Sequence, residues 1–179
     1  MATTFYPRDL NIGIDSYKLA DLSRGSSPVT VTTNTQSGAT WILIDTWSTN
    51  VLEPFTLSGS VSSRIRAFES NVAANVGVEW RIYKWSKATG LSSLVLALSS
   101  AELTTTEASI NLSGTPTSTT FASGDSLVFE IGLINAGGTM AASRTATISY
   151  NGGTLNATGD AFITITENIQ LRNRVLVTE

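Results

Sequence analysis

Apolar and polar residues alternate with a period of two along much of the chain after residue 40. Between Phe55 and Arg66 the odd positions hold mainly apolar or small residues, whereas the even positions hold Thr, Ser and Arg. A strand with one face on a core and the other near solvent has this period. A second run of this kind spans 76–83. Its apolar face consists of Val76, Val78, Trp80 and Ile82.

These two runs follow one another in the chain, so we expect them to form an antiparallel hairpin. Matching their apolar faces places Arg66 opposite Glu79 and Arg64 opposite Arg81. Three cations then surround one carboxylate. Because surplus positive charge favours an acidic partner on another chain, Arg64 and Arg81 are candidate assembly contacts.

Further short strands are expected downstream, separated by Gly and Asn, which tolerate positive φ. No long amphipathic helix is evident. About eight to ten short strands with such turns predict an all-β protein, an antiparallel β-sandwich of jelly-roll type, with a closed β-barrel as the alternative. The further strands are expected over 94–98, 109–112, 127–133, 144–150, 161–166 and 169–177.

Residues 1–35 show less periodicity, and we expect them to form an extended N-terminal arm. They contain Pro7, Pro28 and a Ser-rich stretch between them. A segment of this kind builds no core of its own, so we expect it to dock on neighbouring subunits, with Phe5 and Tyr6 as candidate contacts. Residues 36–179 then form the β-sandwich domain, which includes a C-terminal strand.

The composition narrows the chemistry of the chain. It has no His and no Cys, which removes the commonest general base and the thiol nucleophile. Only 14% of residues are charged and the net charge is −3, so we expect no nucleic-acid partner, which would need a basic stripe. Neither a secretory leader nor an apolar run long enough to span a membrane is evident. We therefore expect no membrane partner and synthesis in a cytoplasm.

Candidate sites for catalysis, cofactors or metals are weak. Glu79 and Glu130 lie in the middle of predicted strands, where a solvated face paired with Arg is the simpler interpretation than a carboxylate pair for glycoside hydrolysis. No acidic loop has calcium-ligand spacing, so we expect no metal and no cofactor. Tyr83 and Trp85 share one strand face and form a candidate stacking pair for a glycan, with packing against a neighbour as the alternative.

Four segments resemble jelly-roll domains of tailed-bacteriophage virion proteins. The resemblance extends over about Thr40 to Thr166 and lies in strand order and turn chemistry. It implies a role in head decoration, or in tail, baseplate or fibre modules, commonly as a trimer or another symmetric oligomer. The segments are Thr56–Val61, Val78–Lys84, Phe121–Ile131 and Ala146–Gly153.

From this resemblance we expect a non-enzymatic virion structural protein, made in the cytoplasm of a bacterial host. A capsid decoration (cement) protein is favoured, because the chain shows no fibre repeats. The expected partners are further copies of the chain, with a trimer favoured, and other virion proteins such as the major capsid protein. The alternative is a carbohydrate-binding or receptor-binding module of a phage tail, baseplate or fibre.

Overall fold

The computed structural model describes residues 1–11, 17–152 and 160–172. These residues form thirteen strands and one short 3-10 helix. In chain order the elements are β1 (Thr3–Asn11), β2 (Lys18–Asp21), β3 (Val29–Asn34), β4 (Trp41–Ser48), β5 (Phe55–Leu57), β6 (Val61–Glu69), η1 (Val72–Ala74), β7 (Val76–Ser86), β8 (Leu91–Ser99), β9 (Ala108–Gly114), β10 (Thr119–Phe121), β11 (Ser126–Asn135), β12 (Thr145–Tyr150) and β13 (Phe162–Ile165).

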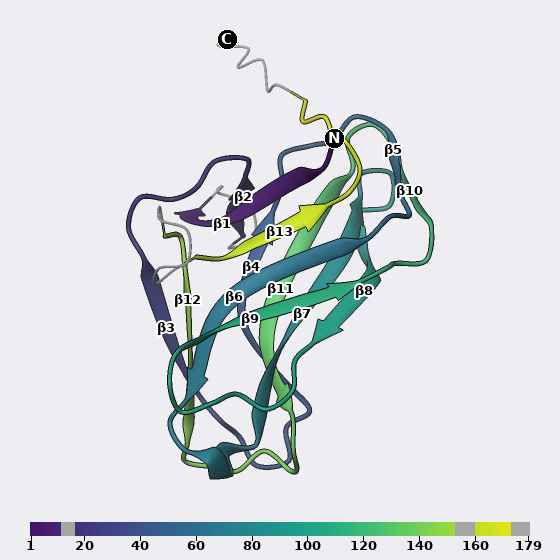
Figure 1. Ribbon diagram of the computed structural model, residues 1–179. Coiled ribbons are helices and arrows are strands. Elements are labelled where there is room, and N and C mark those ends of the chain that lie inside the picture. The colour runs from purple at the N-terminus through teal and green to yellow at the C-terminus, as the bar shows by residue number, and fades with distance from the viewer. Residues whose placement is uncertain (12–16, 153–159, 173–179) are drawn as a thin grey trace.

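The strands are arranged in two layers (Figure 1). One layer contains β9, β6, β12, β3 and β13, and the other contains β2, β4, β11, β7 and β8. Strand β1 pairs with β13 on one side and with β2 on the other, so it joins the two layers. Among the described strands, β2 and β4 form the one parallel pair. The predicted all-β sandwich is therefore confirmed.

The two alternating runs lie in the core as their patterns predict. Every odd position of β6 from Val61 to Glu69 is buried, and so are the four apolar residues of β7 from Val76 to Ile82. At the centre of the core, the Trp47 ring lies 5.6 Å from Trp80 and 5.0 Å from Tyr150 between ring centroids. Alternation thus identified the buried faces correctly.

The expected hairpin between these two runs is wrong. Strand β6 pairs with β9, β12 and β13, whereas β7 pairs with β11 and β8 in the opposite layer. The connection contains η1, which Asn71 caps at its start and Asn75 ends in a left-handed conformation. This connection carries the chain from one layer to the other (Figure 1). Alternation determines which face of a strand is buried but does not choose the neighbouring strand.

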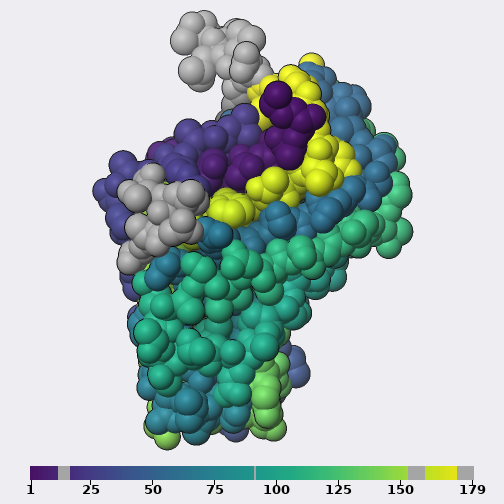
Figure 2. All heavy atoms as spheres, in the orientation of Figure 1, coloured from purple at the N-terminus to yellow at the C-terminus, as the bar shows by residue number. Residues whose placement is uncertain are grey.

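The N-terminal segment is part of the sandwich rather than an extended arm. Phe5 is 1% exposed, and its ring centroid lies 5.7 Å from that of Phe129. Strand β1 pairs with β13 near the other end of the chain, and the two lie side by side on the surface in Figure 2. The alternation of buried residues in β1 stops after Pro7. This alternation is too short for the sequence alone to indicate a core strand.

The strand predicted over 161–166 corresponds to β13. Most of the strand predicted over 169–177 lies outside the described residues. The part that is described, up to Arg172, runs beside the 51–53 loop, with a bridge between Leu171 and Leu52. In the described part of the chain, no helix is long and apolar enough to cross a membrane.

Candidate functional site

The side chains of Arg81, Tyr83 and Trp85 point outward from β7 and are half-buried, as their shared parity predicts. Arg81 Nε donates to Glu79 Oε1 at 2.7 Å, and the guanidinium lies 3.7 Å from the centroid of the Trp41 ring. Ser99 donates a short hydrogen bond of 2.5 Å to the other oxygen of Glu79. Glu79 therefore neutralises the positive charge of Arg81, and the Trp41 ring covers the guanidinium.

Trp41 can reach Arg81 because a glycine lies between their strands. A Cβ at Gly132 would lie 2.6 Å from the Trp41 ring and 2.6 Å from the Ile42 carbonyl oxygen. Because Gly132 has no side chain, the Trp41 indole can pack against β11 at this position.

Tyr83 is held in the same cluster. Burial and the adjacent Glu130 carboxylate raise the pKa of the Tyr83 phenol above its ordinary value, and Tyr83 shares hydrogen bonds with Glu130 and Arg81. The phenol group is thus occupied within the chain. This leaves less of Tyr83 available for a ligand than an isolated surface tyrosine would offer.

Two exposed leucines flank this cluster. Leu43 on β4 is 48% exposed and lies opposite Gly132, whereas Leu94 on β8 is 55% exposed and lies opposite Tyr83. We call this surface of β4, β11, β7 and β8 the outer face. It combines two exposed apolar side chains at its sides with the Arg81–Glu79 ion pair in its middle, beside the Glu130 carboxylate that binds the Tyr83 phenol. The residues that define it are Trp41, Leu43, Glu79, Arg81, Tyr83, Leu94, Ala97 and Glu130.

The expected cluster of three arginines around Glu79 is wrong. Arg64 and Arg66 project from β6 in the opposite layer, where Arg64 Nη1 lies 3.0 Å from Asp160 and Arg66 Nη2 lies 3.2 Å from Glu107. Asp160 is fully buried, and Arg24 Nη1 lies 2.5 Å from its other carboxylate oxygen. Arg64 and Arg81 therefore belong to different surfaces, and Arg64 fastens its own layer together.

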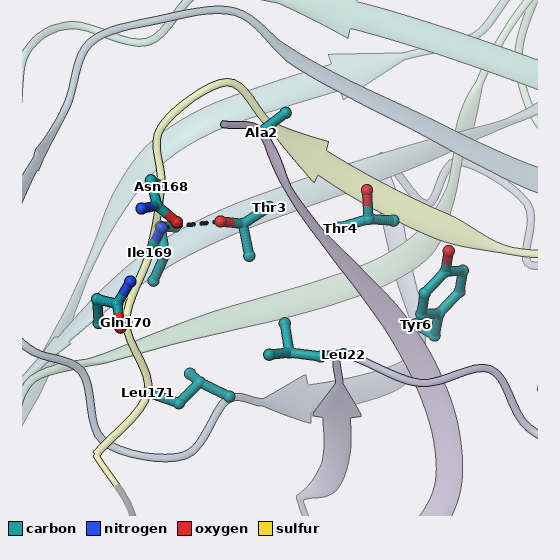
Figure 3. Close-up of a pocket in the computed structure, with 9 residues that line it drawn as sticks. All are labelled: Ala2, Thr3, Thr4, Tyr6, Leu22, Asn168, Ile169, Gln170 and Leu171. Atoms are coloured by element: carbon teal, nitrogen blue, oxygen red, sulfur yellow. Dashed lines mark hydrogen bonds between the residues drawn. The ribbon is translucent and has the colours of Figure 1, made fainter.

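Tyr6 lies in an open groove of about 690 Å³, whereas Phe5 points into the core beside it. Figure 3 shows two segments lining this groove, the start of β1 and residues 168–171, with Leu22 between them. Thr3 joins the two segments, because its hydroxyl accepts a hydrogen bond from the Ile169 amide at 2.8 Å. The Arg24 guanidinium lies 4.8 Å from the Tyr6 ring centroid. The groove offers hydroxyls, amides and aliphatic side chains.

A polar cluster around Lys18 joins β1, β2, β4 and β12. The Lys18 ammonium lies 2.7 Å from Asp45, 2.9 Å from Asp9 and 2.5 Å from the Tyr150 hydroxyl. Burial lowers the pKa of Lys18, but its hydrogen bonds to Asp45, Tyr150 and Asp9 outweigh burial and raise it. Burial raises the pKa of Tyr150. Lysine therefore stays charged and tyrosine neutral, and the cluster fastens the strands together. Within the described residues, no group of three or more acidic side chains could hold a metal ion.

The structure is an all-β sandwich whose outer face carries the exposed Leu43 and Leu94 on either side of the Arg81–Glu79 ion pair. No family model matches the sequence, and no curated protein matches it. The structure is similar to a CocE/NonD family hydrolase from Staphylococcus aureus, with a TM-score of 0.59, 11% identity, and coverage of 94% of this chain and 36% of that one. It is also similar to an aminopeptidase from a marine sediment Thaumarchaeota archaeon, with a TM-score of 0.63, 9% identity, and coverage of 95% and 37%.

A viral structure is similar to a smaller degree. The VP2 subviral particle of infectious bursal disease virus gives a TM-score of 0.31 at 12% identity, with 91% of this chain and 44% of that chain covered. A similarity at this level carries no argument about this chain.

The comparison corrects one expectation. We expected a non-enzymatic protein, and this is contradicted, because four structures similar over 93–95% of this chain, with TM-scores of 0.59–0.63, belong to enzymes. At identities of 8–11% the likeness shows the fold alone. The chain spans about a third of the length of these enzymes.

The sequence predicted the strands that carry the β7, β8 and β11 parts of the outer face and missed its β4 part. Trp41 and Leu43 come from β4, which is not among the predicted strands, although the apolar run 41–44 is a signal for it. The groove was missed because its two walls come from opposite ends of the chain.

Proposed function

We propose that this chain is a virion structural module that packs on a neighbouring protein through its outer face. The observation that carries this proposal is the pair of exposed leucines, Leu43 and Leu94, on either side of the Arg81–Glu79 ion pair. Burying these side chains against another protein would remove apolar surface from water while Arg81 stays paired with Glu79. The resemblance of the sequence to tailed-phage jelly-roll domains supplies the setting.

Within a virion, we favour capsid decoration, with the major capsid protein beneath the outer face and further copies of the chain beside it. The tail or baseplate alternative would use Tyr83 and Trp85 for glycan stacking. The hydrogen bonds of Tyr83 to Glu130 and Arg81 favour decoration over glycan binding, because a ligand would have to compete with them.

The test is the binding of the purified chain to capsids that lack decoration protein. Leu43→Glu should weaken binding about tenfold or more, because it places a charge in an apolar contact. Val72→Glu is the matched control: Val72 is 67% exposed but lies on η1, away from the outer face. Unchanged binding by Leu43→Glu, or no binding by the wild-type chain, would refute the proposal.

A second candidate is a domain that works with a hydrolase. Similarity over more than nine tenths of the chain to parts of such enzymes supports it. An antibody against this chain separates the two candidates in a lysate of the host. A product of 18.9 kDa agrees with the virion module, whereas a product about three times larger, as the 36% coverage suggests, favours the hydrolase domain.

A further inference from the structure

Strand β8 is a long edge strand. It has nine residues, and among the described residues it pairs with β7 alone (Figure 1). The outer side of an edge strand presents amide and carbonyl groups that can pair with another chain.

The edge of β8 has no charged residue and no proline, two features that commonly block such pairing. The nearest charged residues before and after it are Lys87 and Glu102. The side chain of Lys87 packs over Gly124 and that of Glu102 over Gly137, which lie just before and just after β11. Both charges are therefore directed to the β11 side of β7, away from the free edge.

A β-bulge gives β8 a symmetric outer side. The register shifts between Ile82 and Tyr83, so that Val95 is an extra residue. The β8 residues opposite the outward positions of β7 are then Ser92, Leu94, Ala97 and Ser99, and all four are exposed. This set is symmetric about the midpoint between residues 95 and 96.

We propose that two copies of this chain pair through β8 about a two-fold axis. In this antiparallel register Leu94 lies opposite Ala97 of the second copy, and Ser92 lies opposite Ser99 of the second copy. A two-fold contact needs a surface that is complementary to itself, and the symmetric outer side of β8 meets this requirement. The contact brings no like charges together and shields Leu94 from water.

The pairing joins the β4, β11, β7 and β8 layers of two copies into one continuous sheet. The outer face of each copy then continues into that of the other. The assembly unit is a two-fold dimer, in place of the trimer that the sequence resemblance implies. This inference does not rest on the proposed function, because the purified chain alone can be tested.

Because the chain has no Cys, introduced cysteines report the contact without background. Directly opposite residues in an antiparallel pair have Cα atoms about 4.5–5.5 Å apart, within the span of a disulfide. The variant Leu94→Cys/Ala97→Cys should therefore form a reducible dimer under mild oxidation. Each single variant should stay monomeric on the gel, because two copies of the same position lie three residues, roughly 10 Å, out of register. Mixing the two single variants should restore the cross-link.

The matched control is Ser92→Cys/Leu94→Cys, which carries the same number of cysteines on the same side of β8. In the proposed register none of its cysteines faces a cysteine of the second copy, so this variant should give no disulfide-linked dimer on the gel. A dimer band from this control, or none from Leu94→Cys/Ala97→Cys, would overturn the proposal.

Sedimentation of the cysteine-free chain gives a second measurement. Leu94→Glu should weaken the dimer about tenfold, since it places a carboxylate against Ala97 of the second copy. Removal of residues 173–179 should leave the dimer unchanged. Loss of the dimer on this truncation would show that the C-terminal segment makes the contact, and a wild-type chain that is monomeric at all concentrations would also contradict β8 pairing.

Discussion

Truncating Phe5 tests whether the N-terminal segment is a strand of the core. The side chain is 1% exposed and packs on Phe129 with ring centroids 5.7 Å apart. Replacing a buried phenylalanine by alanine removes transfer free energy and leaves a cavity, at a total cost of about 3–5 kcal/mol. We expect about 3 kcal/mol for Phe5→Ala, because water can enter the cavity from the adjacent groove. A domain of this kind has a free energy of unfolding of about 5–15 kcal/mol, so the loss is a large share of it.

Urea unfolding followed by tryptophan fluorescence measures this loss. With a slope of about 2 kcal/mol/M, the midpoint should fall by about 1.5 M. Leu10→Ala is the matched control on the same strand, since Leu10 is 54% exposed. It should change the free energy of unfolding by no more than about 0.5 kcal/mol.

Deleting residues 1–11 is a stronger test of the placement of β1 in the core. It removes β1, which joins the two layers, so we expect the truncated chain to lose its cooperative transition. A truncated chain that unfolds at the wild-type midpoint, or a Phe5→Ala midpoint equal to that of Leu10→Ala, would refute the placement of β1 in the core. The segment would then be the docking arm that the sequence suggested.

Three further substitutions test other parts of the structure. Burial, with the nearby Glu102 charge, raises the pKa of the Glu69 carboxyl above its ordinary 4.5. The folded state therefore holds this proton more tightly than the unfolded state, and the free energy of unfolding falls as pH rises above about 4.5. Glu69→Gln should remove that part of the fall, and an unchanged pH profile between about pH 4 and pH 7 would contradict it. Asp160→Asn should cost about 2 kcal/mol in urea unfolding, below the usual cost for a buried ion pair because its arginine partners are 21% and 24% exposed; a loss under about 0.5 kcal/mol would contradict its bridging role. Trp85→Ala should lower stability by about 1–3 kcal/mol while the wild-type chain retains no sugar on a glycan array; sugar retained by the wild type and lost in the variant would favour the tail alternative.

Alternation predicted the buried faces of β6 and β7 because the period of side chains along a strand is a local property. It could not predict their partners, since β6 pairs with β9, β12 and β13 over long separations in the chain. For the same reason Arg66 was assigned to Glu79, whereas it binds Glu107.

In the outer face, too, the sequence predicted the residues that share one strand but not the contacts between strands. Arg81, Tyr83 and Trp85 share a side of one strand and were predicted together. Trp41 reaches Arg81 only because β11 places Gly132 between them, and no local pattern contains that pairing. The position of Phe5 depends on contacts with β11 and β13, so its local sequence resembled an arm.

Mass spectrometry of virions purified from the host that carries this gene tests the virion assignment most directly. We predict that the chain copurifies with the particles through a density gradient, in a fixed ratio to the major capsid protein. Absence of its peptides from the particles, together with their recovery as part of a longer enzyme in the host lysate, would contradict the assignment.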